Sequence, residues 1–113
     1  MRLFVVSPAA LAGSLQEYLL ERLSTEISIA DMAGRVELSR AQFLRHFKAL
    51  AGTSPHQWVM AARVQKAKEL IAESNLSLDE IAASCGFASR THLATVFKRF
   101  VNLSPAVYRR EIR

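Results

Sequence analysis

The chain has 113 residues, of which 50% are hydrophobic, so it is long enough for one compact domain or two very small ones and too apolar to be disordered. Its 15 Lys and Arg outnumber its 10 Asp and Glu, and the net charge of +5 favours a polyanionic partner. The single cysteine excludes an internal disulfide and fits a reducing cytoplasm, and no apolar run reaches the roughly 18 residues of a transmembrane helix. We therefore expect a cytoplasmic protein with no membrane partner.

The pattern of residues predicts an all-α fold of about seven helices, in which a long connector helix joins two helix-turn-helix subdomains. Only four Gly and three Pro interrupt the chain, and no run of alternating β-branched residues indicates a strand. Residues 1–13 have no apolar stripe at helical spacing before Leu11, and they are expected to form a tail or the remnant of a linker. A scaffold helix is predicted from Ser14 to about Leu23. Its apolar stripe is formed by Leu15, Tyr18, Leu19 and Leu23.

Two helices joined by a short turn follow, and they complete a first subdomain of residues 14–53. Ser28 and Asp31 begin the first of these helices. Ser39 with Gln42 forms a capping-box signature at the start of the second, and Gly52 is expected to end it. The predicted inward residues of the second helix are Phe43, Phe47 and Leu50.

Residues 54–75 predict the connector helix. Ser54 and Pro55 supply a cap and a first-turn proline, and no helix breaker follows until about Ser74, which implies a helix of roughly 19 residues. The residue pattern leaves two roles open for Arg63 in this helix, namely an ion pair with an acidic scaffold residue or a phosphate contact.

Residues 76–113 predict a second subdomain of the same kind. Ser77 with Glu80 begins a short helix, and Gly86 can take the positive φ that ends it. Ser89 then begins a longer helix. The predicted inward residues of this longer helix are Leu93, Val96, Phe97 and Phe100.

A final helix is predicted to begin at Ser104 and Pro105. Tyr108 is expected to pack inward from it. Its basic residues are expected to be available to phosphate or solvent, and they are Arg109, Arg110 and Arg113.

The two helix pairs form an internal repeat. A shift of 50 residues superimposes Ser39 on Ser89, and the preceding helices match at a shift of 49, with Met32 on Ile81. Other matched pairs are Arg40 with Arg90, Phe47 with Phe97, Lys48 with Lys98, Ser54 with Ser104 and Pro55 with Pro105. The second unit therefore has one extra residue in its turn. Two helices joined by a tight turn are typical of the helix-turn-helix motif, whose second helix enters the DNA major groove.

The outward face of the second helix in each pair is small, hydroxylic or cationic, apart from one leucine. The candidates for reading base edges are Arg40, Ala41, Leu44, Arg45, Arg90, Thr91, Ala94 and Thr95. The candidates for phosphate contacts are Ser39, Lys48, Ser89, His92, Lys98 and Arg109. An arginine such as Arg45 can donate two hydrogen bonds to guanine, whereas Leu44 is equally well explained as a contact to a thymine methyl or as an ordinary exposed leucine.

The distribution of charge supports the same interpretation. Residues 38–68 hold six Lys or Arg and no acid, and residues 81–110 hold five and no acid. Thus 11 of the 15 basic residues and none of the 10 acidic ones lie in the stretches that contain the two proposed recognition helices. A protein that is merely basic and soluble usually intersperses the two signs, so this segregation indicates a nucleic-acid partner.

Many spaced positions together resemble the DNA-binding domain of AraC/XylS-type transcriptional regulators, over about Leu15 to Arg110. The positions are Phe47-Lys48, Gly52, Ser54-Pro55, Arg63, Ala67, Leu70, Ile81-Ala82, Gly86-Phe87, Phe97-Lys98-Arg99-Phe100, Ser104-Pro105 and Tyr108-Arg109. Two residues depart from the family pattern: Asn102 replaces a common Gly, and Leu93 replaces a common aromatic residue. Asn tolerates the left-handed conformation and Leu fills a similar pocket, so both are compatible with the fold.

The resemblance implies a bipartite domain that binds specific double-stranded DNA sequences, reads successive major-groove segments and regulates transcription. It also implies further partners, namely RNA polymerase and a separate effector-binding or dimerisation domain. For Arg63 it favours the structural role.

Two other classes of protein fit the sequence less well. An enzyme is disfavoured, because the three histidines fall on different helices and Cys85 with His92 provides two ligands where a structural zinc site needs four. We accordingly predict no cofactor and no metal. The remaining alternative is a helical protein–protein interaction module without DNA binding, which would use the region of Trp58.

Overall fold

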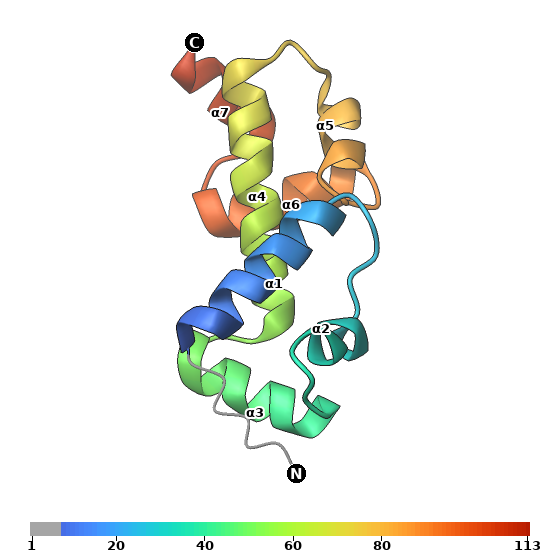
Figure 1. Cartoon of the computed structure of the whole chain (residues 1–113). Coiled ribbons are helices and arrows are strands. Elements are labelled where there is room, and N and C mark those ends of the chain that lie inside the picture. Colours follow the sequence, from blue (N-terminus) through green and yellow to red (C-terminus); the bar gives the residue numbers. More distant parts are fainter. Residues whose placement is uncertain (1–7) are drawn as a thin grey trace. The chain divides into compact units, whose positions relative to one another are not determined.

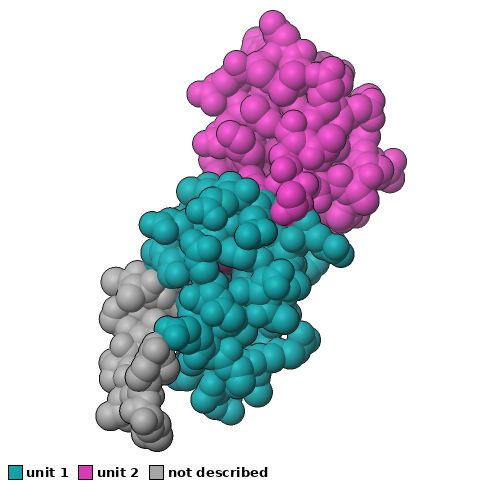
Figure 2. Space-filling view, turned by 45° about the vertical axis from the view of Figure 1, so that its right-hand side comes forward, with its two compact units in different colours: residues 1–22, 26–56 teal, residues 23–25, 57–113 magenta. Residues whose placement is uncertain are grey.

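The computed structural model describes residues 8–113, and these form seven helices and no strand (Figure 1). The all-α prediction is confirmed. The chain divides into two compact units, which are described separately below (Figure 2). Residues up to 22 together with 26–56 form the first unit, and residues 23–25 together with 57–113 form the second.

The first unit contains α1 (Pro8–Arg22), α2 (Ile29–Arg35) and α3 (Arg40–Ala51). The predicted caps are present, since the Ser28 hydroxyl accepts from the Asp31 amide at 3.0 Å and Ser39 forms a reciprocal capping box with Gln42. Helix α1 packs on α2, and α2 packs on α3. The buried core of this unit consists of Leu15, Tyr18, Leu19, Met32, Ala33, Val36, Phe43 and Phe47.

Helix α1 begins at Pro8, and the prediction that it would begin at Ser14 is wrong. Proline fixes a helical φ at a first position where its missing N–H is not needed, and the following Ala9 to Ala12 are strong helix formers. An apolar stripe indicates which residues are buried and not which residues are helical. The start of the helix was therefore predicted too late in the chain. Residues 1–7 of the predicted tail lie outside the described residues.

The second unit contains most of α4 (Pro55–Glu73), together with α5 (Leu78–Ser84), α6 (Arg90–Val101) and α7 (Pro105–Ile112). Only the first two residues of α4 group with the first unit. The helix expected to connect the units therefore belongs mainly to the second. The buried residues of α4 are Pro55, Val59, Met60, Arg63, Val64, Ala67 and Ile71.

Arg63 joins α4 to the segment that follows α1. Its Nε donates to the Leu23 carbonyl at 3.2 Å, and its Nη2 donates to the Thr25 carbonyl at 2.7 Å. The side chain is only 8% exposed, and its burial lowers the pKa of the guanidinium from its ordinary value. Of the roles considered from the sequence, the structure shows a structural one, with backbone carbonyls in place of an acidic side chain.

Gly86, in the turn between α5 and α6, lies against this arginine. Its φ is +83°, a left-handed conformation that only glycine adopts without strain. A Cβ atom there would overlap the Leu23 carbonyl oxygen and lie 2.9 Å from Arg63 Cζ. The predicted role of Gly86 in the turn is confirmed, and close packing adds a second requirement.

Left-handed residues occur at matching positions in the two units. In the turns, Glu37 has φ +57° where Gly86 has +83°, and after the longer helices Gly52 has φ +72° where Asn102 has +67°. Each unit therefore has glycine at one of the two positions and another residue at the other. The expectation that Asn102 takes the left-handed conformation is confirmed.

We expect Asn102→Ala to lower the free energy of unfolding by about 1 kcal/mol, because alanine lacks the side-chain hydrogen bonding that helps asparagine adopt φ > 0. Asn102→Gly should be neutral or slightly stabilising. Urea titrations of both variants would measure this. Equal loss of stability in the two would show that the Asn102 side chain itself, and not its backbone conformation, matters.

Two predicted core residues are exposed. Leu50 is 48% exposed and Phe100 is 38% exposed, and they are equivalent in the repeat. Both lie in the last turn of their helix, one turn beyond the buried Phe47 and Phe97. Periodicity extends a stripe to the end of a helix, but burial requires a covering neighbour, and none covers this turn completely.

Arg113 makes hydrogen bonds that the sequence did not predict. Its Nη2 donates to the Ile71 carbonyl at 3.0 Å and to the Ser74 carbonyl, and its Nη1 donates to Asn75 Oδ1 at 3.3 Å. The Ile71 carbonyl belongs to the last turn of α4, and the Ser74 carbonyl directly follows the helix, where backbone carbonyls lack a helical partner. Arg113 thus caps the end of α4 and remains exposed.

Candidate nucleic-acid interface

Helix α3 has an apolar inner face and a cationic outer face. Phe43 and Phe47 are 0% and 4% exposed, and their ring centroids lie 5.5 Å apart. The exposed outer positions include Arg40, Ala41, Arg45 and Lys48, and Leu44 is partly buried. The structure therefore places all five predicted α3 residues away from the aromatic core, with no acidic residue between them.

Helix α6 repeats this division. Leu93, Val96 and Phe97 are buried, and the Phe97 ring meets Tyr108 of α7 edge-on at 5.4 Å between centroids. On the opposite face the exposed residues are Arg90, Thr91, Thr95 and Lys98, and Ala94 is partly buried. Aromatic packing therefore fixes the rotation of α6 about its axis, and this rotation presents the predicted residues to the outside.

The N-termini of both helices are tied by their caps. Ser39 Oγ accepts from the Gln42 amide at 3.2 Å, and Gln42 Oε1 accepts from the Ser39 amide at 3.0 Å. Ser89 Oγ likewise accepts from the His92 amide at 3.0 Å. Because a hydroxyl that accepts one hydrogen bond retains its own proton, both predicted serines can still donate to a phosphate.

His92 stands where the first unit has Gln42, but it accepts from the amide before the cap residue and not from the cap residue itself. Its Nδ1 accepts from the Ala88 amide at 3.2 Å, and its ring packs edge-on against Phe87 at 5.4 Å between centroids. In the neutral ring the proton then lies on Nε2, which is the remaining donor for a phosphate. The predicted phosphate role of His92 is compatible with this geometry, and its capping role was missed.

Thr95 has less freedom than the sequence implied. Its Oγ1 donates to the Thr91 carbonyl one turn earlier, at 3.1 Å. The hydroxyl proton is therefore already used, and what Thr95 offers a base edge is a methyl group and acceptor lone pairs.

Arg109 is partly buried. Its Nε and Nη2 are shielded from solvent and have no hydrogen-bond partner among the described residues. A phosphate contact by this predicted residue would have to use Nη1, or the side chain would have to move. Of the six phosphate candidates, Arg109 is the one that the geometry supports least.

Sequence reasoning overlooked Asp79, in the first turn of α5. Its Oδ2 lies 4.0 Å from Nη1 of Arg90, and the two side chains are 73% and 57% exposed. The repeat offered a signal, because a shift of 49 places Ala30 where the second unit has Asp79. The two units therefore differ in charge beside their equivalent arginines.

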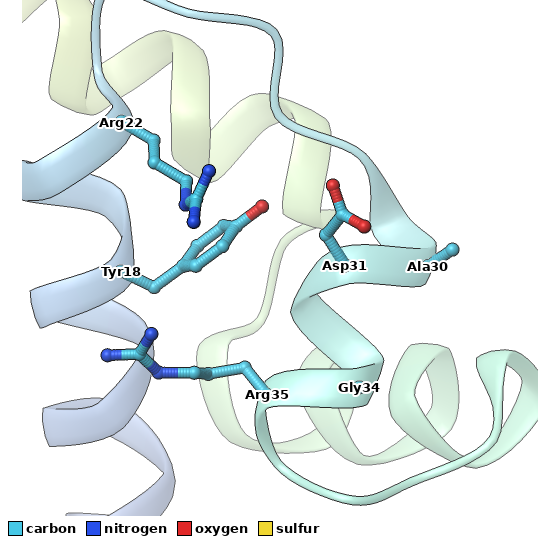
Figure 3. A pocket seen from close by; sticks show the side chains of 6 residues that line it. All are labelled: Tyr18, Arg22, Ala30, Asp31, Gly34 and Arg35. Carbon is cyan, nitrogen blue, oxygen red and sulfur yellow. The ribbon is translucent and has the colours of Figure 1, made fainter.

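A polar groove of about 420 Å³ lies elsewhere in the first unit, between α1 and α2 (Figure 3). The guanidinium carbons of Arg22 and Arg35 lie 5.2 and 5.8 Å from the ring centroid of Tyr18. Burial raises the pKa of the Tyr18 phenol from its ordinary value, and the charge of Asp31 adds to this. These contacts link the two helices around a neutral tyrosine and contain none of the predicted site residues.

The described residues hold no group of three or more potential metal ligands. Burial raises the pKa of the Cys85 thiol to about 11, so this buried cysteine is protonated at neutral pH and is a poor ligand. No helix in the described part of the chain is long and apolar enough to cross a membrane.

Comparison with known proteins gives consistent results. A family profile described as "Helix-turn-helix domain" matches residues 32–111. The chain is 38% identical to "HTH-type transcriptional regulator MtrA" of Neisseria gonorrhoeae and 35% identical to "Probable transcriptional regulator LumQ" of Photobacterium leiognathi. Both matches cover 88% of this chain, but only 33% and 40% of those proteins.

Solved structures agree. The DNA-binding domain of AdpA, determined in complex with a target DNA, matches with a TM-score of 0.84 and 38% identity, over 91% of this chain and 92% of that one. An AraC-type DNA-binding domain-containing regulator from Chromobacterium violaceum matches with a TM-score of 0.85 and 25% identity, over 92% of this chain and 93% of that one.

Proposed function

Because this chain belongs to the helix-turn-helix family of AraC-type DNA-binding domains, we propose that it binds specific sequences of double-stranded DNA and thereby regulates transcription. One observation carries the proposal. Two equivalent helices, α3 and α6, bury an aromatic inner face and expose an outer face with cationic residues and no acid. Such a face can approach a polyanion, and the second helix of a helix-turn-helix pair is the one that reads the major groove.

In this proposal α3 and α6 each enter a major-groove segment of the same DNA. Arg40, Arg45 and Arg90 supply the guanidinium donors that guanine N7 and O6 can accept in pairs. Ala41, Leu44, Ala94 and the methyl groups of Thr91 and Thr95 supply small apolar surfaces that suit a thymine methyl. The specificity of each unit therefore comes from a few donors set among methyl groups.

Phosphate contacts hold each unit in register. The exposed Lys48 and Lys98 are equivalent in the repeat, and the capping serines Ser39 and Ser89 lie where helix N-termini favour anions. Such contacts supply affinity but carry no sequence information directly.

The chain spans less than half the length of these two relatives. We further propose that the domain acts in the cytoplasm beside RNA polymerase and under the control of an effector-binding or dimerisation domain.

The proposal is tested by selecting bound sequences from a random pool of duplexes and titrating the selected duplex at several salt concentrations. The logarithm of the binding constant should fall linearly with the logarithm of salt concentration, by about 0.9 per phosphate contact. A flat salt response, or a pool without enrichment, would overturn the proposal and favour a protein–protein interaction module.

We expect Arg45→Ala to weaken binding to the selected duplex by about 1–3 kcal/mol and to relax the preference at one base pair. The matched control is Lys48→Ala on the same face, which should weaken all duplexes by a similar factor and reduce the salt slope by about one contact. Competition titrations with single-base variants of the duplex distinguish the two results. An unchanged base preference in Arg45→Ala would remove Arg45 from the base-reading set.

A further inference from the structure

Asp79 and Arg90 form an ion pair whose contribution to the fold is small. The atoms Asp79 Oδ2 and Arg90 Nη1 lie 4.0 Å apart, and both side chains are more than half exposed. Exposed pairs of this kind contribute little to stability because solvent screens them. A carboxylate beside a proposed base-reading arginine must nevertheless act on the donors that this arginine offers to DNA.

The internal repeat allows Asp79 to be compared with its equivalent in the first unit. Arg90 is equivalent to Arg40, each being the first residue of its helix after the serine cap. Helices α2 and α5 both carry an acid at the next position, Asp31 and Glu80. The position before it differs in charge, since Asp79 is equivalent to Ala30. Arg90 therefore has a carboxylate, Asp79, at a position where the first unit has alanine.

We propose that Asp79 is a positioning residue that acts through Arg90 and sets the base specificity of the second unit. The proposal rests on the proposed function. A guanidinium has five N–H donors in a rigid planar fork, and a carboxylate that attracts Nη1 leaves a defined edge for the DNA. Guanine offers two acceptors to that edge, so it gains more than the other bases from an arginine whose side chain is already ordered.

Asp79 also lowers the affinity for DNA of any sequence. The first helix of a helix-turn-helix pair crosses the DNA backbone, and Asp79 lies in the first turn of that helix. Its negative charge repels phosphate at every sequence, whereas the gain through Arg90 is made only at the correct base. The repulsion is common to all sequences and cancels in the difference between them, so the discrimination comes from the gain through Arg90, and the repulsion lowers the affinity for every sequence. In α2 the equivalent Ala30 adds no such repulsion.

The test uses Asp79→Ala and Asp79→Asn in the whole chain. The base pair read by Arg90 is first located as the one at which Arg90→Ala loses its preference. Affinity is then measured for the selected duplex, for the three other base pairs at that position, and for an unrelated duplex. We expect both Asp79 variants to bind the unrelated duplex about fivefold more tightly and to lose about fivefold in discrimination at that one position. Their urea midpoints should be unchanged, and Asp79→Glu should retain most of the discrimination.

The reciprocal variant is Ala30→Asp in the first unit. It should weaken binding to the unrelated duplex and sharpen the preference at the base pair assigned to Arg40 by Arg40→Ala. Unchanged discrimination in Asp79→Ala, where Arg90→Ala relaxes it, would overturn the role of Asp79 while leaving the proposed function intact. An Arg90→Ala variant with unaltered base preference would overturn it as well. Absence of enrichment with the wild-type chain would instead overturn the proposed function.

Discussion

Replacing Gly86 with alanine is expected to lower the free energy of unfolding by more than about 3 kcal/mol. The left-handed backbone alone costs an alanine about 1–2 kcal/mol. The added Cβ would overlap the Leu23 carbonyl oxygen and press on the Arg63 guanidinium. Relief of that overlap requires movement of the carbonyl that Arg63 Nε binds at 3.2 Å, so a buried hydrogen bond is strained as well.

Gly52→Ala is the matched control for this prediction. Gly52 has φ +72°, and a Cβ atom there meets nothing within 4 Å. It therefore carries the backbone cost without the overlap, and it should lose only about 1–2 kcal/mol. Urea titrations followed by far-UV circular dichroism measure both values. Equal losses for the two variants would show that the turn relaxes and that the close approach to Leu23 is unimportant.

Replacing Arg63 with methionine is expected to lower the free energy of unfolding by about 3–5 kcal/mol. The variant removes two hydrogen bonds from a charged donor and leaves the Leu23 and Thr25 carbonyls without these partners. The free energy of unfolding of typical domains is about 5–15 kcal/mol. A loss of this size would therefore leave a sizeable fraction of a marginally stable domain unfolded. Arg63→Lys should recover only part of it, because one ammonium cannot reproduce two donors in a fixed fork.

Arg110→Met is the control for Arg63→Met, since Arg110 is exposed and its replacement should change stability by less than about 0.5 kcal/mol. The same titrations apply. A loss for Arg63→Met as small as that for Arg110→Met would mean that water replaces the guanidinium at both carbonyls. Because Gly86 and Arg63 are in contact, we also expect the double variant Gly86→Ala with Arg63→Met to lose less than the sum of the single losses.

Local patterns predicted most of the helices. Each predicted serine cap of α2, α3, α5, α6 and α7 accepts a hydrogen bond from the amide three residues later, because a cap depends only on neighbouring residues. The shifts of 50 and 49 predicted the extra residue in the second turn, and the structure shows four residues between α2 and α3 but five between α5 and α6. Such features are encoded within a few positions of the chain.

The candidate interface was predicted for the same reason, but only as two helix faces. The 3.6-residue period separates Phe43 and Phe47 from Arg40 and Arg45, and the structure keeps that separation. The period gives no information about partners from other helices. It therefore missed the pair of Asp79 with Arg90, which joins two helices at 4.0 Å, and it treated Arg109 as freely available.

The sequence by itself determined the serine-capped starts of α2, α3, α5, α6 and α7, the repeat and the family, since these depend on residues close together or equally spaced. Only the tertiary structure decided what covers each side chain. Leu50 and Phe100 continue their apolar stripes and are exposed, whereas Arg63 is cationic and buried against two carbonyls 40 and 38 residues away. Arg113, at the end of the chain, likewise caps a helix that ends at Glu73. Burial and hydrogen bonding are properties of surroundings that folding assembles from distant segments, so a pattern along the chain does not contain them.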